Sequence, residues 1–174
     1  QSWPRGRQPR LGAVSAFAQD AAGFERFSAE LVRATEPGDH YQWRYNAAAL
    51  VRGGVALGRD RDAIEWSSGR SERFGHQAPE ALVALSAGKG SINTHPEVSI
   101  VRALARAHWR TGASSRALDL LQCVPRAENH EKGLVAWLQE LAHLERALAL
   151  HHLGRKAEAA ELARDVGSRL PELH

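Results

Sequence analysis

The sequence predicts an all-α protein of stacked antiparallel helical hairpins, with about seven or eight helices in 174 residues. Three observations support this fold class. Apolar residues recur at the spacing of one helical face, and no segment has the sustained alternation typical of a strand. Glycine, proline and capping residues interrupt this pattern at intervals that suit short turns. A spaced glycine and alanine also occur three times along the chain.

The turn signals divide the chain into a lead-in and one domain. Residues 1–12 hold three arginines together with prolines and glycines, which favours a flexible basic lead-in. A single helical-repeat domain is expected to follow, over residues 13–174. Its predicted elements are three hairpins, at about 40–74, 95–124 and 132–170, and two extra helices, at about 16–35 and 79–87.

Apolar faces and end signals support the first elements in order. Phe24 and Phe27 lie on one face of the helix at 16–35, and proline and glycine follow it. The next helix carries Trp43 on its apolar face and ends at Gly58. We expect its partner to continue to Gly75. The short helix after that begins with a proline, whose fixed φ suits a first helical turn.

The later elements have equally local signals. Thr94 and Glu97 form a capping box, in which each side chain can satisfy a backbone N–H at the start of the second hairpin. The second helix of that hairpin begins at Ser114 or Ser115 and ends before Pro125. A glycine separates the two helices of the third hairpin.

The repeated motif is a glycine followed five residues later by an alanine. The three pairs are Gly58 and Ala63, Gly112 and Ala117, and Gly154 and Ala159. The glycine permits a tight turn between two helices, and the alanine lets the second helix approach the first closely. We therefore expect these alanines to be contact positions between paired helices.

These motifs resemble the tetratricopeptide repeat. Residues 56–64 and 152–160 are similar to the family's turn and second-helix start, and the resemblance covers about residues 43–171. Successive glycines are 54 and 42 residues apart, whereas the family repeats every 34, so an extra short helix and a lengthened helix are needed. The resemblance implies an α-solenoid whose first helices line a concave binding surface.

Counting from the shared glycines nominates the side chains of this concave surface. They are Tyr45, Arg52, Arg102, Arg106, Trp109, Arg110, His151 and His152. Guanidinium groups suit carboxylates, and the resemblance implies basic groove residues that hold an acidic peptide or a terminal carboxylate. The alternative is that these arginines lie on an outer face or pair with nearby acids.

The third hairpin fits the repeat less simply. His143 and Arg146 occupy positions at which the first helix of a repeat should be apolar, whereas Leu141, Leu144 and Leu148 fall at groove positions. Either this helix is turned, or the groove is apolar at this end and docks another helix.

The sequence has no pattern typical of catalysis or metal binding. The stretch at 85–91 lacks the spacing of a phosphate-binding loop. His143 and His151 are about 12 Å apart by helical rise, too far to share a metal. We expect surface or groove histidines, a buried Cys123, and no catalytic residue, metal or cofactor. The sequence thus predicts that the protein is not an enzyme.

Charge and composition restrict the partners. The net charge of +3 comes from the lead-in arginines, so the folded part is balanced and nucleic acid is not an expected partner. No apolar run approaches the roughly 20 residues that cross a bilayer, so no membrane partner is expected. A lone cysteine suits the cytoplasm. Because methionine is absent, even at position 1, we expect a fragment or a processed product.

These observations predict a scaffold that binds another protein or a peptide. The basic groove suits an acidic partner, and the oligomeric state is left open. One alternative is the sensor or regulatory domain of a bacterial transcription regulator, in which similar helical repeats receive a signal. The Ala-, Arg- and Leu-rich composition suits a high-GC bacterium. A second alternative is an enzyme of unrecognised type.

Overall fold

The computed structural model describes residues 20–34, 42–71, 78–90, 92–127 and 133–170, and these residues form eight helices and no strand. The predicted all-α class is therefore confirmed. The helices are α2 (Ala21–Ala34), α3 (Gln42–Ala56), α4 (Asp60–Ser67), α5 (Glu80–Ser86), α6 (His95–Arg110), α7 (Ser114–Gln122), α8 (Leu134–His152) and α9 (Lys156–Arg169). The predicted lead-in lies outside the described residues.

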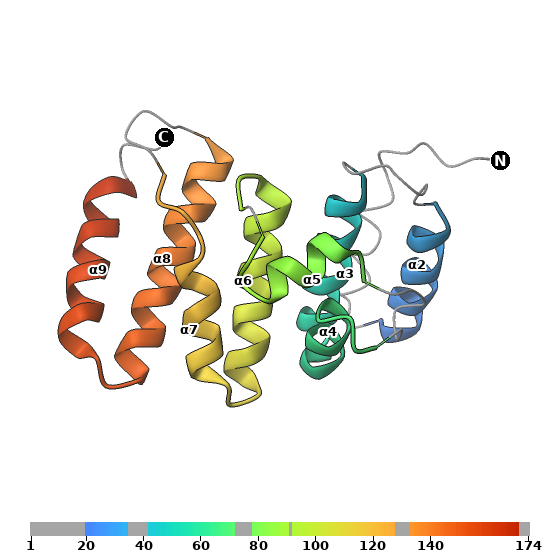
Figure 1. Ribbon diagram of the computed structural model, residues 1–174, viewed down its shortest axis with the longest axis horizontal. Coiled ribbons are helices and arrows are strands. Elements are labelled where there is room, and N and C mark those ends of the chain that lie inside the picture. The colour runs from blue at the N-terminus through green and yellow to red at the C-terminus, as the bar shows by residue number, and fades with distance from the viewer. Residues whose placement is uncertain (1–19, 35–41, 72–77, 91, 128–132, 171–174) are drawn as a thin grey trace.

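Six of these helices pair as neighbours in the chain, α3 with α4, α6 with α7 and α8 with α9. The first helices of the pairs also contact one another, α3 against α6 and α6 against α8. In addition, α4 contacts α6 and α7 contacts α8. The helices thus form an elongated row with α2 at one end and α9 at the other (Figure 1).

One turn geometry joins the helices of all three pairs. Gly58, Gly112 and Gly154 have φ values of +74°, +86° and +80°, a left-handed conformation that L side chains rarely adopt. In each turn the glycine N–H and the following N–H donate to carbonyls three and five residues back, at 2.8–3.1 Å. The repeated glycine therefore has the role that its spacing predicts.

The repeated alanines are buried at the helix contacts. Ala63 is 0% exposed, Ala117 1% and Ala159 5%. A larger side chain at Ala63 or Ala159 would hold the paired backbones apart. The expectation that they are close-contact positions is confirmed.

The second helix of the first hairpin is shorter than predicted. α4 ends at Ser67 and not near residue 74, because Gly69 takes a positive φ of +73° directly after it. The N–H of Arg70 donates to the Glu65 carbonyl at 2.9 Å, which completes a helix-ending turn. Gly69 therefore ends this helix earlier than the predicted Gly75, which lies outside the described residues.

The main hydrophobic core runs from α2 to the middle of α8, with α6 at its centre. At one end, Phe24 of α2 is fully buried against Gly53 of α3. A Cβ at Gly53 would lie 2.2 Å from the Phe24 ring, so only glycine permits this approach. At the other end, a smaller separate cluster of Leu118, Ala149, Leu150 and Ala159 joins α7, α8 and α9.

The start of α6 has the predicted capping box. The Glu97 carboxylate accepts hydrogen bonds from the N–H groups of Asn93 and Thr94, both at 2.9 Å. Within the described part of the chain, no helix has the length and apolar character needed to cross a membrane.

Candidate binding groove

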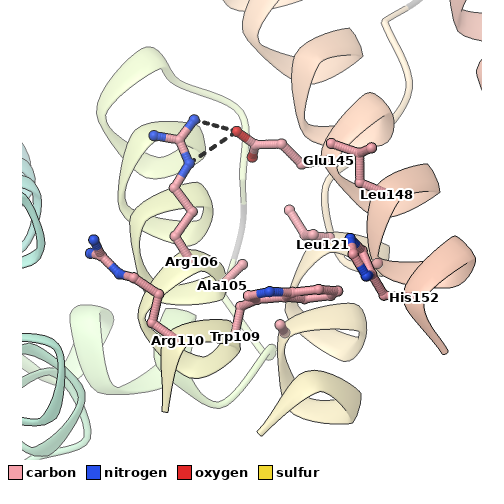
Figure 2. A pocket seen from close by; sticks show the side chains of 10 residues that line it. Ala105, Arg106, Trp109, Arg110, Leu121, Glu145, Leu148 and His152 are labelled. Atoms are coloured by element: carbon pink, nitrogen blue, oxygen red, sulfur yellow. Dashed lines mark hydrogen bonds and ion pairs between the residues drawn. The ribbon is translucent and has the colours of Figure 1, made fainter. Parts of the chain in front are cut away.

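A cavity of about 410 Å³ lies between α6, α7 and α8 (Figure 2). This volume falls in the range of roughly 300–1,000 Å³ that is usual for ligand pockets. Its lining is mainly apolar, with charged groups at the rim. The lining residues are Ala105, Arg106, Trp109 and Arg110 of α6, Ala117 and Leu121 of α7, and Glu145, Leu148, Ala149 and His152 of α8.

Trp109 connects the two first helices that border the cavity. Its indole extends from α6 towards His152 of α8, and the two ring centroids are 4.9 Å apart with the planes at 70° (Figure 2). The Trp109 ring packs against the main core and also against the smaller cluster of α7, α8 and α9. Contacts with both clusters fix the position of the Trp109 indole, so the flat apolar surface that it offers is preformed, as is usual in ligand sites.

Glu145 of α8 holds two arginines of α6. Its carboxylate oxygens accept from Arg102 Nε at 3.0 Å and from Arg102 Nη2 at 2.7 Å. The same carboxylate accepts from Arg106 Nε at 3.1 Å, with a second contact from Arg106 Nη2. Two guanidinium charges therefore share one carboxylate. The Arg102 side chain is 14% exposed and that of Arg106 is 59% exposed, so the excess positive charge faces solvent at Arg106.

The third arginine of α6 turns away from the cavity. Arg110 donates to Asp60 of α4 at 2.7 and 3.1 Å and to the Val55 carbonyl at 2.6 Å. Only its stem lines the cavity, and Figure 2 shows the guanidinium directed away from Trp109. Pairing with nearby acids, the alternative that the sequence left open, thus holds for all three arginines.

Four of the eight predicted groove residues line the cavity, namely Arg106, Trp109, Arg110 and His152. Arg102 lies behind them in the Glu145 ion pair, and exposed His151 lies next to His152, with ring centroids 6.0 Å apart. Tyr45 and Arg52 of α3 are exposed but are not part of its lining. Arg52 lies near His95, whose pKa is lowered chiefly by burial and further by the Arg52 charge.

The sequence did not identify the α7 wall or the acid of this site. Ala117 was predicted as a packing position and not as a groove residue, and Leu121 was not singled out. Glu145 was also missed, although it follows Leu144 and lies three residues before Leu148, on the same side of α8. That spacing was the available signal.

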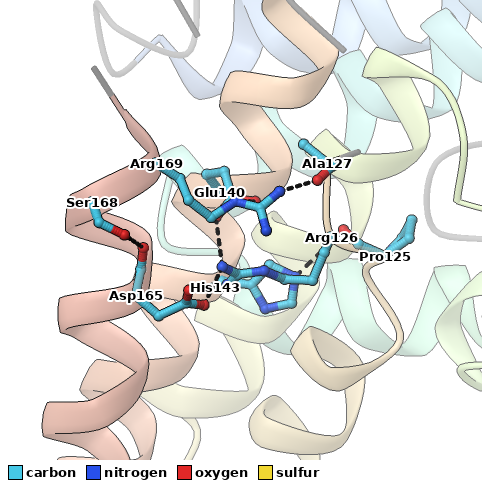
Figure 3. A network of polar contacts seen from close by, with 8 residues as sticks. All are labelled: Pro125, Arg126, Ala127, Glu140, His143, Asp165, Ser168 and Arg169. Atoms are coloured by element: carbon cyan, nitrogen blue, oxygen red, sulfur yellow. Dashed lines mark hydrogen bonds and ion pairs between the residues drawn. The ribbon is translucent and has the colours of Figure 1, made fainter. Parts of the chain in front are cut away.

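A second polar cluster fastens α9 and the segment after α7 to α8 (Figure 3). We call it the Glu140 clasp; it consists of Glu140, Arg126 and Arg169 with Asp165. The Glu140 side chain is 0% exposed and lies 3.3 Å from Arg126 Nη2 and 3.6 Å from Arg169 Nε. Arg126 also pairs with Asp165 of α9. Because these charges neutralise one another, they connect elements and offer little to a ligand.

His143 lies beside this clasp and is only 2% exposed, so the expectation of a surface or groove histidine is wrong for it. Its Nε2 is 3.4 Å from the Pro125 carbonyl oxygen. Burial chiefly, and the Arg126 charge next, lower the pKa of His143 to about 4. A neutral imidazole can be buried at modest cost, which is why a polar residue is tolerated on the inner face of α8.

Cys123 is exposed, so the expectation that it is buried is also wrong. It follows the last residue of α7, on the side of the helix opposite to buried Ala117 and Leu121. The apolar residues beside it in sequence misled the prediction. Among the described residues, no group of three or more His, Cys, Asp or Glu side chains is placed to hold a metal ion.

Comparison with protein-family models, with curated proteins and with solved structures gives no match. The resemblance to tetratricopeptide repeats therefore stays an expectation from the sequence, and the geometry of the groove is the basis for assigning a function.

Proposed function

We propose that this protein is a scaffold that binds another protein or a peptide, and that its binding site is the cavity between α6, α7 and α8. The observation that carries the proposal is the pairing of an apolar cavity with an exposed guanidinium at its rim. Trp109 and Leu148 supply the apolar surface, and Arg106 supplies the charge.

Each part of the cavity has a distinct role in this proposal. An apolar side chain of the partner would be buried against Trp109, Leu121 and Leu148, which stabilises the complex by roughly 25 cal/mol for each Å² of apolar surface removed from water. A partner carboxylate next to it would meet Arg106, whose excess charge Glu145 only partly neutralises. The apolar contact gives affinity, and the ion pair gives orientation.

Selection from a library of random peptides of about twelve residues, displayed on phage, tests the proposal with the purified protein as target. We expect enrichment of sequences that combine an apolar residue with a nearby Asp or Glu. Trp109→Ala and Arg106→Gln should each reduce capture of the enriched peptides. Arg164→Gln, which changes an exposed arginine on α9, serves as the matched control and should not.

Two results would contradict the proposal. One is a selection that enriches nothing above the uncoated surface. The other is capture that Trp109→Ala leaves unchanged while circular dichroism shows a folded protein, since binding would then occur elsewhere.

A further inference from the structure

The outward side of α8 is apolar along most of its length. Leu134 and Leu148 are each 58% exposed and Trp137 is 37% exposed, with half-buried Leu141 and Leu144 between them. Successive members are three or four residues apart, so they lie on one side of the helix. We call these five residues the α8 stripe.

The α8 stripe is continuous with the cavity but extends well beyond it. Leu148 belongs to both. From there to Leu134 the helix rises by about 21 Å. One side chain that fills the cavity would leave Leu134 and Trp137, at the other end of the stripe, in water. Contiguous exposed apolar surface of this kind usually marks a binding site on a folded protein.

We infer that the partner is an amphipathic helix that lies along the α8 stripe, with an acidic residue at the end that reaches Arg106. This inference rests on the proposed function and specifies its partner. A partner helix with apolar residues every three or four positions matches the stripe's own spacing, so side chains of each helix fit between those of the other. Its carboxylate would offset the charge that Arg102 and Arg106 leave after sharing Glu145.

Charge complementarity favours this occupant over a second copy of the chain. Two antiparallel α8 helices would bring the Leu134 end of one copy to the Arg106 end of the other. The described residues at that end, 133–138, carry no acid, and Glu140 beyond them is buried in its clasp. Within the described residues, a second copy would therefore cover the leucines but bring no new acid to Arg106; Glu128 and Glu131 lie outside the described residues.

A library of displayed helices about five turns long tests the inference. Positions spaced three and four apart vary among Leu, Ile, Phe and Ala, and flanking positions vary among Glu, Lys and Gln. We expect enrichment of large apolar residues along the whole helix, with Glu near one end. Enrichment of Lys there, or of no helix at all, would overturn the inference.

The enriched helix, labelled with a fluorophore, then maps the surface by fluorescence anisotropy. Leu134→Ser combined with Trp137→Ala changes only the distant end of the α8 stripe and should weaken binding about tenfold or more, as truncated apolar anchors do. Leu153→Ala is the matched control, because Leu153 is 40% exposed at the end of α8 but lies off the stripe. It should leave the affinity within about twofold.

The pattern of effects distinguishes a failure of the helix inference from a failure of the proposed function. If Leu148→Ala and Arg106→Gln weaken binding but the distant pair does not, the occupant is short, and the helix inference fails while the proposed function stands. If none of these changes matters, both fail. Sedimentation that shows a dimer dissociated by the distant pair would assign the stripe to a second copy and overturn the inference.

Discussion

α6 and α8 are each the first helix of a hairpin, yet they differ in the residues that they bury and expose. The buried side of α6 is largely aliphatic, with Val98, Ile100 and Leu104 at 0–1% exposure, and its open side carries arginines. α8 buries Gln139, Glu140 and His143 among its alanines and leucines. Its open side carries the α8 stripe of leucines and a tryptophan.

This difference indicates what each hairpin relies on for stability. α6 lies in the main core, so α6 and α7 are held chiefly by apolar burial. α9 contributes buried Ala159 and partly buried Leu162 to the smaller apolar cluster, and the Glu140 clasp also connects it to α8. Leu141 of the α8 stripe packs against the main core, whereas exposed Leu134, Trp137 and Leu148 are free to contact a partner.

The largest expected effect comes from breaking the clasp. Glu140→Ala leaves Arg126 and Arg169 facing one another without their shared carboxylate, and removal of one partner from a buried ion pair costs about 3–5 kcal/mol. Both arginines keep some exposure, so we expect the lower end of this range. Urea unfolding monitored by circular dichroism measures the loss.

Hydrogen exchange should show that this loss is local, with α9 losing protection before α3 and α6. The control is Glu158→Ala, which removes an exposed acid of α9 that pairs with Arg155, the residue before the helix, and should leave the midpoint nearly unchanged. Equal loss of protection in α3 and α9 would mean that the two regions do not differ as we describe.

The second prediction concerns pH and His143. Burial lowers its pKa to about 4 in the folded state, below the ordinary 6.5. Between these values the unfolded chain binds the extra proton, so stability is fully present above about pH 6.5 and is lost as the pH falls towards 4. From about pH 7 to about pH 5, this one group should cost about 2 kcal/mol.

Urea unfolding of the wild type and of His143→Gln at these two pH values isolates the effect. The variant should lose about 2 kcal/mol less than the wild type on acidification. His151→Gln, at an exposed position on the same helix, controls for the substitution itself. If the wild type and His143→Gln lose the same free energy of unfolding on acidification, the His143 imidazole does not have the lowered pKa on which this prediction rests.

The parts of the fold that the sequence predicts correctly depend on local signals. A glycine such as Gly112 permits the positive φ of a turn between helices, and an alanine such as Ala159 lets two helices approach closely, so both can be identified from their neighbours in the chain. The side of α6 that carries Arg106 and Trp109 follows from helical periodicity in the same way.

What the sequence did not predict depends on contacts between distant residues. Glu145 meets Arg102 across 43 positions, and nothing near either residue indicates that they pair. His143 was expected outside because polar residues usually are, yet Pro125 and Arg126, which follow α7, cover it. Three arginines of α6 pair with only two acids, which leaves positive charge at Arg106. This arrangement is evident only from the three-dimensional structure.

The smallest expected effects come from replacing two of the repeated alanines, Ala117 in the second hairpin and Ala159 in the third. Ala159 packs among Leu118, Ala149 and Leu150, and it is not part of the cavity lining. Ala159→Leu should therefore overpack the contact between α8 and α9 and cost about 1–3 kcal/mol. Ala117 occupies the same position of the motif but lines the cavity, so the larger side chain of leucine can extend into existing space. Ala117→Leu should cost less than about 1 kcal/mol and should instead reduce capture of the selected peptides, because it fills their site.

Thermal unfolding of both variants measures the loss of stability, and peptide capture by both variants measures the loss of binding. A larger loss of stability for Ala117→Leu than for Ala159→Leu would mean that the cavity cannot accept a side chain, and the assignment of this cavity as the binding site would fail with it.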